Sequence, residues 1–176
     1  MNVRALIALA ACVSLCAGLG GCWRSTALLL DPAAGARPLA DGAYAKVGGD
    51  AETDRIVWRG GGWYELQDEG SISIFTLTPL GDIGGRPAFA AAMADDGCQS
   101  GEAEDCEWDY GVVFLDKDTV LVSAPDCKDS SILAHRFGAT PLPDSSACDF
   151  ASGAELKAAL AEYAQNPAKP DRFIRK

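Results

Sequence analysis

The sequence predicts an α+β domain: an antiparallel β meander of about seven strands that can curl into a small open barrel, with one or two C-terminal helices. Three observations lead to this prediction. Short runs of β-type residues recur from residue 43 onward, and turn residues separate them. The connections are too short for crossover helices, which favours antiparallel neighbours. The last third instead contains helix signals.

The strand signals alternate between apolar and polar residues, as in Ile56 and Trp58 or Val112 and Phe114. Glycine-rich joints such as Gly60–Gly62 suit hairpin turns because glycine adopts positive φ easily. Between Ile74 and Phe75 the apolar phase shifts, which predicts a bulge or a bend. The expected strands are Tyr44–Val47, Arg55–Arg59, Trp63–Gln67, Ser71–Thr78, Pro87–Met93, Tyr110–Leu115 and Thr119–Ser123.

Two helices and a final strand are expected after these runs. A short helix within Asp126–Phe137 would end before Gly138, a typical residue after a helix C-terminus. Ser152-Gly153-Ala154-Glu155 matches the capping box S-x-x-E and opens a helix to about Gln165. Leu156, Ala159, Leu160 and Tyr163 have the spacing of one buried helix face. Arg172–Arg175 is expected to return as a closing edge strand.

The N-terminal residues 1–21 have the pattern of a secretory signal. Arg4 precedes an uncharged apolar run from Ala5 to Leu19. This run of about 15 residues is shorter than the roughly 20 that a membrane span needs. The sequence therefore predicts export across a membrane.

The end of this segment, Leu19-Gly20-Gly21-Cys22, resembles the lipobox of bacterial prolipoproteins. The resemblance covers residues 1–22 alone, and no family is identified for the rest of the chain. It implies cleavage before Cys22, acylation of Cys22 and attachment to the lipid bilayer in the cell envelope, facing the periplasm. Trp23 follows the cysteine in place of the aspartate that retains enteric lipoproteins in the inner membrane, so the resemblance favours the outer membrane.

Three segments follow from these signals: a signal peptide over 1–21, a lipidated cysteine with a tether over 22–42, and one globular domain over 43–176. The tether is expected because residues 23–42 are rich in alanine, proline and glycine without a sustained period. Within it, Leu28–Leu30 is expected either to dock on the domain or to lie near the lipid.

Four of the seven cysteines remain once the signal and Cys22 are set aside. An even number in an exported chain predicts disulfides, and four cysteines allow three pairings. Pairing between neighbours would give Cys98–Cys106 and Cys127–Cys148. The spacing lacks the C-x-x-C knuckles of zinc ribbons, so no zinc site is expected at these cysteines, and no cofactor is expected.

The chain carries a net charge of −10, and loss of Arg4 with the signal makes the mature part −11. This charge disfavours nucleic acid as a partner, because a nucleic-acid binder needs a basic surface. Acids concentrate between Asp95 and Asp109, and three interpretations are open: a solvated loop, a surface for a basic protein partner, or a Ca²⁺ site without EF-hand spacing. The candidate binding residues are Asp95, Asp96, Glu102, Glu104, Asp105, Glu107 and Trp108.

Catalytic motifs are missing from the sequence, which contains neither GxSxG, SxxK nor HExxH. His135 is the single histidine and is expected on a helix surface. The leading hypothesis is therefore a non-catalytic envelope lipoprotein that binds a basic protein. Two alternatives stay open: an apolar-ligand-binding barrel, which an enclosed apolar pocket would support, and a glycoside hydrolase that uses a carboxylate pair.

Overall fold

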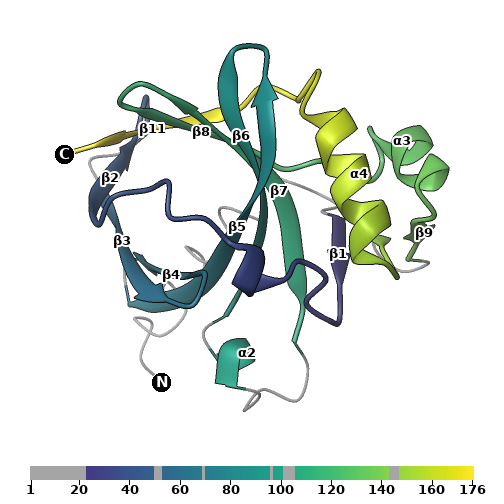
Figure 1. Cartoon of the computed structure of the whole chain (residues 1–176), viewed down its shortest axis with the longest axis horizontal. Coiled ribbons are helices and arrows are strands. Elements are labelled where there is room, and N and C mark those ends of the chain that lie inside the picture. Colours follow the sequence, from purple (N-terminus) through teal and green to yellow (C-terminus); the bar gives the residue numbers. More distant parts are fainter. Residues whose placement is uncertain (1–22, 50–52, 69, 96, 101–105, 143–146) are drawn as a thin grey trace, which may run out of the picture.

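The computed structural model describes residues 23–49, 53–68, 70–95, 97–100, 106–142 and 147–176. Eight antiparallel strands form a closed barrel in the order β2-β3-β4-β5-β6-β7-β8-β11, and β11 pairs with β2 to complete the ring (Figure 1). The barrel strands are β2 (Gly42–Lys46), β3 (Thr53–Gly60), β4 (Trp63–Asp68), β5 (Ser71–Ile83), β6 (Arg86–Asp95), β7 (Trp108–Asp116), β8 (Thr119–Ser123) and β11 (Asp171–Arg175).

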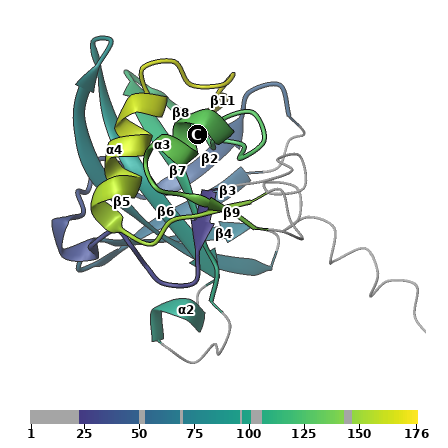
Figure 2. The same ribbon diagram turned by 90° about the vertical axis from the view of Figure 1, so that its right-hand side faces the viewer.

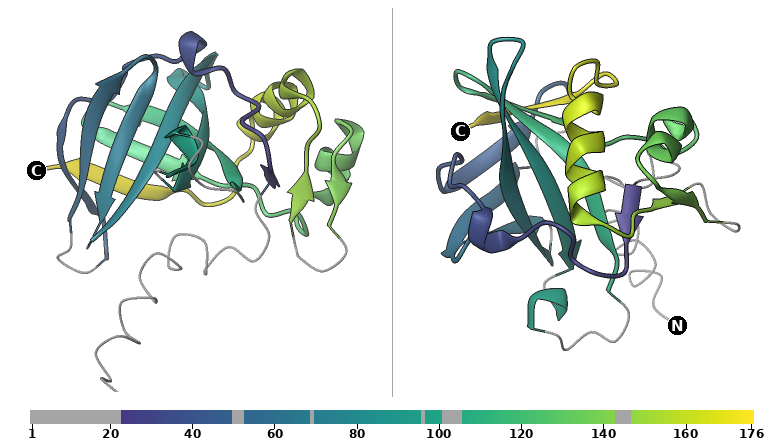
Figure 3. Two further views of the ribbon diagram at one scale, coloured as in Figure 1. Left: turned by 90° about the horizontal axis from the view of Figure 1, so that it is seen from below. Right: turned by 45° about the vertical axis from the view of Figure 1, so that its right-hand side comes forward.

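The remaining elements lie outside this ring. The strand β1 (Trp23–Ser25) pairs with β7, and it joins β10 (Cys148–Asp149) and β9 (Thr140–Pro141) to the same sheet. Three α-helices and a 3-10 helix are described: η2 (Pro32–Ala34), α2 (Gly97–Ser100), α3 (Ser131–Arg136) and α4 (Gly153–Tyr163). Figures 2 and 3 show α3 and α4 packed on one side of the barrel.

Strand alternation gives the barrel two separate apolar clusters. The inner cluster lines the barrel interior and includes Tyr64, Phe75, Phe89, Val113 and Phe173. The outer cluster lies between the barrel wall and α4, where Leu156 and Leu160 are fully buried. Small side chains on the outward face of β6 let the helix approach closely; these are Ala88, Ala90 and Ala92.

The expected fold class is confirmed, and closure of the barrel goes beyond it. The predicted edge strand is wrong, because β11 pairs on both sides, with β8 and with β2. The predicted bulge between Ile74 and Phe75 is also wrong. The register of β5 stays regular there and shifts between Pro79 and Gly81. Both residues are apolar because Ile74 faces the outer cluster and Phe75 the inner one.

The helix predictions agree with the structure. In α4 the Ser152 side chain accepts a hydrogen bond from the Glu155 backbone N–H, as the capping box requires. After α3, Gly138 adopts a positive φ of 78°, which ends the helix. The four predicted face residues of α4, Leu156, Ala159, Leu160 and Tyr163, are all buried.

Residues 23–42, expected as a tether, are instead part of the folded domain. Trp23 is 0% exposed, and Leu30 and Leu39 are also buried. After η2 the chain passes over one end of the barrel before it enters β2 (Figures 1 and 3). There a Cβ on Gly62 would lie 1.7 Å from the carbonyl oxygen of Pro32, so a glycine is needed for this close contact. The sequence did not indicate this, because the buried apolar residues Trp23, Leu30 and Leu39 do not recur at a helix or strand period.

Candidate functional site

The barrel encloses a cavity of about 410 Å³. Ligand sites commonly measure about 300–1,000 Å³, and an eight-stranded barrel has room for one small ligand. Eight barrel strands contribute side chains to the lining, so the cavity follows the barrel interior. The structure therefore has a preformed internal space of the size that small molecules occupy.

The wall of the cavity is mainly apolar. It combines aliphatic and aromatic side chains from neighbouring strands with small residues that leave space, among them Ala91 on β6 and Gly111 on β7. A Cβ on Gly111 would lie 3.1 Å from the Ser123 carbonyl oxygen, so this glycine keeps β7 and β8 close together. The apolar lining residues include Leu39, Tyr44, Ile56, Leu66, Phe75, Ala91, Met93, Val113, Val120, Val122 and Phe173.

One end of the barrel, here called the closed end, is sealed by the segment that precedes β2. The Tyr64 hydroxyl accepts a hydrogen bond from the Leu39 backbone N–H at 3.0 Å and donates to the Leu39 carbonyl oxygen at 3.2 Å. Trp58 packs edge-on against the Tyr64 ring, with ring centroids 4.7 Å apart. Burial raises the pKa of Tyr64 to about 12, so its hydroxyl stays protonated and keeps both hydrogen bonds.

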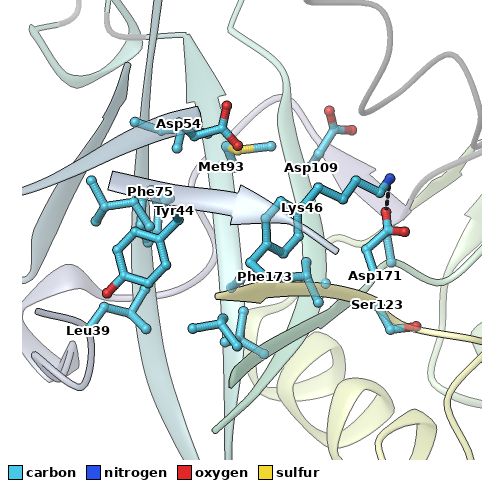
Figure 4. A pocket seen from close by; sticks show the side chains of 18 of the residues that line it. Leu39, Tyr44, Lys46, Asp54, Phe75, Met93, Asp109, Ser123, Asp171 and Phe173 are labelled. Atoms are coloured by element: carbon cyan, nitrogen blue, oxygen red, sulfur yellow. Dashed lines mark hydrogen bonds and ion pairs between the residues drawn. The ribbon is translucent and has the colours of Figure 1, made fainter. Parts of the chain in front are cut away.

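The opposite end, here called the open end, carries the charged part of the lining. Lys46 and Asp171 form an ion pair at 2.8 Å, and their side chains are 49% and 51% exposed. Lys169 is also exposed there, whereas Leu39 and Tyr44 at the other end of the cavity are buried. Figure 4 shows Lys46, Asp109 and Asp171 grouped apart from Leu39 and Tyr44. The cavity therefore meets solvent at the open end.

Two carboxylates face each other at this end. Asp54 on β3 and Asp68 on β4 occupy opposing positions of one hairpin. They lie on the same face of this hairpin as Ile56 and Leu66, which line the cavity. Burial, followed by the charge of Asp68 and a hydrogen bond between the two carboxyl groups, raises the pKa of Asp54 to about 6. The mouth thus holds a carboxyl group whose pKa lies well above its ordinary value.

A second charged cluster lies beside the mouth on β7. Arg24 of β1 contacts Glu107 at 2.8 Å and Asp109 at 3.3 Å, and Asp109 contributes to the cavity lining. The positively charged Arg24 side chain thus lies beside both acids and neutralises part of their charge.

The predicted acidic binding residues are only partly described. Asp96, Glu102, Glu104 and Asp105 lie outside the described residues, and of Asp95 only its place in β6 is described. Glu107 is exposed and pairs with Arg24. Trp108, expected on a binding surface, is 4% exposed and packs with Trp63 at 5.8 Å in the outer cluster, so that prediction is wrong for its side chain. Cys22 also lies outside the described residues.

The cysteines pair as expected for neighbours in sequence. Cys98 bonds to Cys106 and Cys127 to Cys148, with Cα atoms 5.6 and 5.3 Å apart. His135 is exposed on α3 and does not line the cavity. Over the described ranges, no three His, Cys, Asp or Glu side chains come together as a metal site. No helix in the described part of the chain is long and apolar enough to cross a membrane.

Sequence reasoning missed the residues that shape the cavity mouth. One signal was present: Asp54 and Asp68 stand equally far on either side of the Gly60–Gly62 turn, so a regular hairpin brings them opposite each other. No comparable signal marks Asp109 or Asp171, which reach the mouth through long-range pairing.

Comparisons with known protein families, curated proteins and solved structures give no match for this chain.

Proposed function

We propose that this chain is an acylated envelope protein whose barrel binds one small, largely apolar molecule. The observation that carries the proposal is the cavity of about 410 Å³ with apolar walls, a sealed end and a charged mouth. At roughly 30 Å³ for each water-sized group, the cavity has room for about 14 such groups. A single medium-length acyl chain or a compact ring system fits this size.

The shape of the lining favours an amphiphile over a purely apolar ligand. Its walls offer aliphatic and aromatic contacts, while Lys46, Asp54 and Asp171 surround the opening. An apolar body would lie inside and a polar group would stay at the mouth, where it keeps its contact with water.

Membrane attachment rests on the lipobox resemblance at Leu19–Cys22. Acylation at Cys22 would hold the domain on the periplasmic side of the envelope, with the outer membrane favoured by Trp23. The two disulfides support the export part of this proposal, because such bonds persist in oxidising compartments.

The two other candidate functions have less support. The hypothesis of a basic protein partner rests on the negative charge of the mature chain, and Trp108, the aromatic candidate beside the acidic residues, is buried. A glycoside hydrolase needs two carboxyl groups about 5–9 Å apart, whereas Asp54 and Asp68 are in direct hydrogen-bond contact. Neither candidate gains an observation from the described residues.

The fluorescent amine N-phenyl-1-naphthylamine provides a direct test, because it is uncharged and brightens in apolar surroundings. We expect the mature chain to bind it with a micromolar Kd. Ala91→Phe places a ring in the cavity and should weaken binding at least about tenfold, since the ring takes the place of the ligand. Ala158→Phe makes the same change on the exposed face of α4 and serves as the control.

Two results would contradict the proposal. One is the absence of any fluorescence change in a folded wild-type chain. The other is equal binding by Ala91→Phe and wild type, which would place the probe outside the barrel.

A further inference from the structure

The described chain begins at a residue that is firmly held. Trp23 is 0% exposed, and its indole N–H donates to the Ser130 hydroxyl at 3.0 Å. Its ring lies 5.0 Å from that of Phe150 and 5.9 Å from that of Tyr163. Because one peptide unit spans about 3.8 Å, an acyl anchor on Cys22 would be joined to the folded domain without a flexible spacer.

This fixed start lies beside the cavity. Trp23 stands opposite Tyr110 in the β1–β7 pair, and Asp109, Tyr110 and Gly111 all contribute to the cavity lining. Opposed Cα atoms of antiparallel strands are about 4.5–5.5 Å apart. Trp23, the residue that follows Cys22 in sequence, therefore lies about 5 Å from the cavity-lining strand β7.

Two of the exposed large apolar side chains stand at the open end. Among the described residues, the exposed large hydrophobic side chains are Val47 (47%), Ile72 (41%) and Ile132 (86%). Val47 directly follows β2 and Ile72 is the second residue of β5, so both stand at the open end. Ile132 lies on α3, two residues after the Ser130 that holds Trp23.

Long cationic side chains accompany them. Lys46 and Lys169 are exposed at the open end, where Lys46 also pairs with Asp171, whereas Arg24 beside Trp23 is paired with Glu107 and Asp109. Lysine and arginine side chains reach from an apolar boundary to lipid head groups, so they are compatible with a membrane surface despite the negative net charge. Neither Val47 nor Ile72 stands at the closed end.

From these positions we infer that the open end of the barrel rests on the bilayer that holds acylated Cys22, so that the cavity takes its amphiphile directly from that bilayer. Val47 and Ile72 enter the interfacial region, and the closed end points away from the membrane. This inference rests on the proposed function, both for the acyl anchor and for the ligand, and adds the surface from which the ligand comes.

Hydrogen–deuterium exchange on the acylated chain in vesicles tests this orientation. The vesicles contain phosphatidylethanolamine with a minor share of phosphatidylglycerol. The reference is the whole mature chain with Cys22→Ser, mixed with the same vesicles. Relative to the reference, amides around Val47 and Ile72 should exchange about tenfold more slowly in the acylated chain, whereas those in the Gly60–Gly62 and Gly84–Gly85 turns should not change.

Matched charge variants sharpen the test. A double variant with Val47→Asp and Ile72→Asp places two carboxylates at the open end. It should remove most of the protection of these amides from exchange. The control double variant, Gly84→Asp with Thr119→Asp, places two carboxylates at the closed end. It should leave the protection of the open-end amides from exchange intact. Gly84 has a φ of 61°, which aspartate tolerates, and a Cβ there meets no atom within 4 Å.

The outcomes separate the inference from the proposal beneath it. Equal exchange at both ends, or protection at the closed end, overturns the orientation. If the Cys22→Ser chain still binds N-phenyl-1-naphthylamine in that case, the ligand proposal survives and the orientation alone fails. Failure of that chain to bind the probe instead refutes the ligand proposal.

Discussion

Asp54 shows how a single residue reports on the cavity. It faces Asp68 across the β3–β4 hairpin, and Tyr44 stands opposite it on β2. Burial and the second carboxylate both disfavour its ionised form, which raises its pKa from 3.8 to about 6. A cavity that was open to water on all sides would not shift the pKa in this way.

Replacement of Asp54 by asparagine should therefore change stability in a pH-dependent manner. Because the folded pKa exceeds the unfolded one, the stabilising contribution of the protonated form is complete below about pH 4 and is lost as the pH rises through about 6. At pH 8, Asp54→Asn should be more stable than wild type by about 1–2 kcal/mol, a value reduced for solvent screening near the mouth.

Urea unfolding at pH 4 and pH 8 measures this difference. The gain should shrink or vanish at pH 4, where the wild-type carboxyl is protonated. Asp82→Asn, at an exposed position in β5 near the closed end, provides the control. An equal effect of Asp54→Asn at both pH values would show that ionisation of this group is not coupled to folding.

At the scale of elements, sequence patterns located the barrel strands because each of them alternates or runs between turn residues. The strand β1 was not predicted because three residues are too few to show an alternation of apolar and polar side chains. Its pairing with β7 and β10 also depends on positions more than 80 residues away. Alternation also failed in β5. A strand with apolar clusters on both faces loses its period of two, so Ile74 and Phe75 look like a phase shift.

The two disulfides stabilise different elements and should differ in reactivity. Cys127 and Cys148 are 5% and 0% exposed, and Cys148 pairs directly with Trp23 in the β1–β10 ladder. Cys98 and Cys106 are half-buried around α2 and close a shorter loop. Reductant therefore reaches the Cys98–Cys106 bond without unfolding, whereas the Cys127–Cys148 bond needs local opening.

Timed alkylation under native conditions checks this order. With dithiothreitol and iodoacetamide, peptides that contain Cys98 and Cys106 should be labelled first, and Cys127 and Cys148 should follow only near the unfolding midpoint. Replacement of Cys127 and Cys148 by serine should cost about 3 kcal/mol in the chain-entropy model, against about 2.5 kcal/mol for replacement of the half-buried pair Cys98 and Cys106. Simultaneous labelling of all four cysteines would contradict the assignment.

At the scale of the whole molecule, closure and the cavity could not be predicted from the sequence. The meander was visible, but the ring closes through β11, which follows an excursion of 47 residues that contains α3 and α4. The cavity arises from the sum of many lining side chains. Exchange of Ala91 for a larger residue would reduce the cavity without altering the alternation of apolar and polar residues in β6.

The proposed attachment to a membrane concerns the whole chain, and intact mass tests it. Protein recovered from its native membrane should begin at Cys22, exceed the polypeptide mass by its acyl groups, and gain about four hydrogen masses on reduction. Retention of residues 1–21 without lipid would refute the anchor. Because Trp23 is fixed in the fold directly beside the cavity, an acylated Cys22 also brings the cavity to the membrane, so this mass decides where a ligand has to be sought.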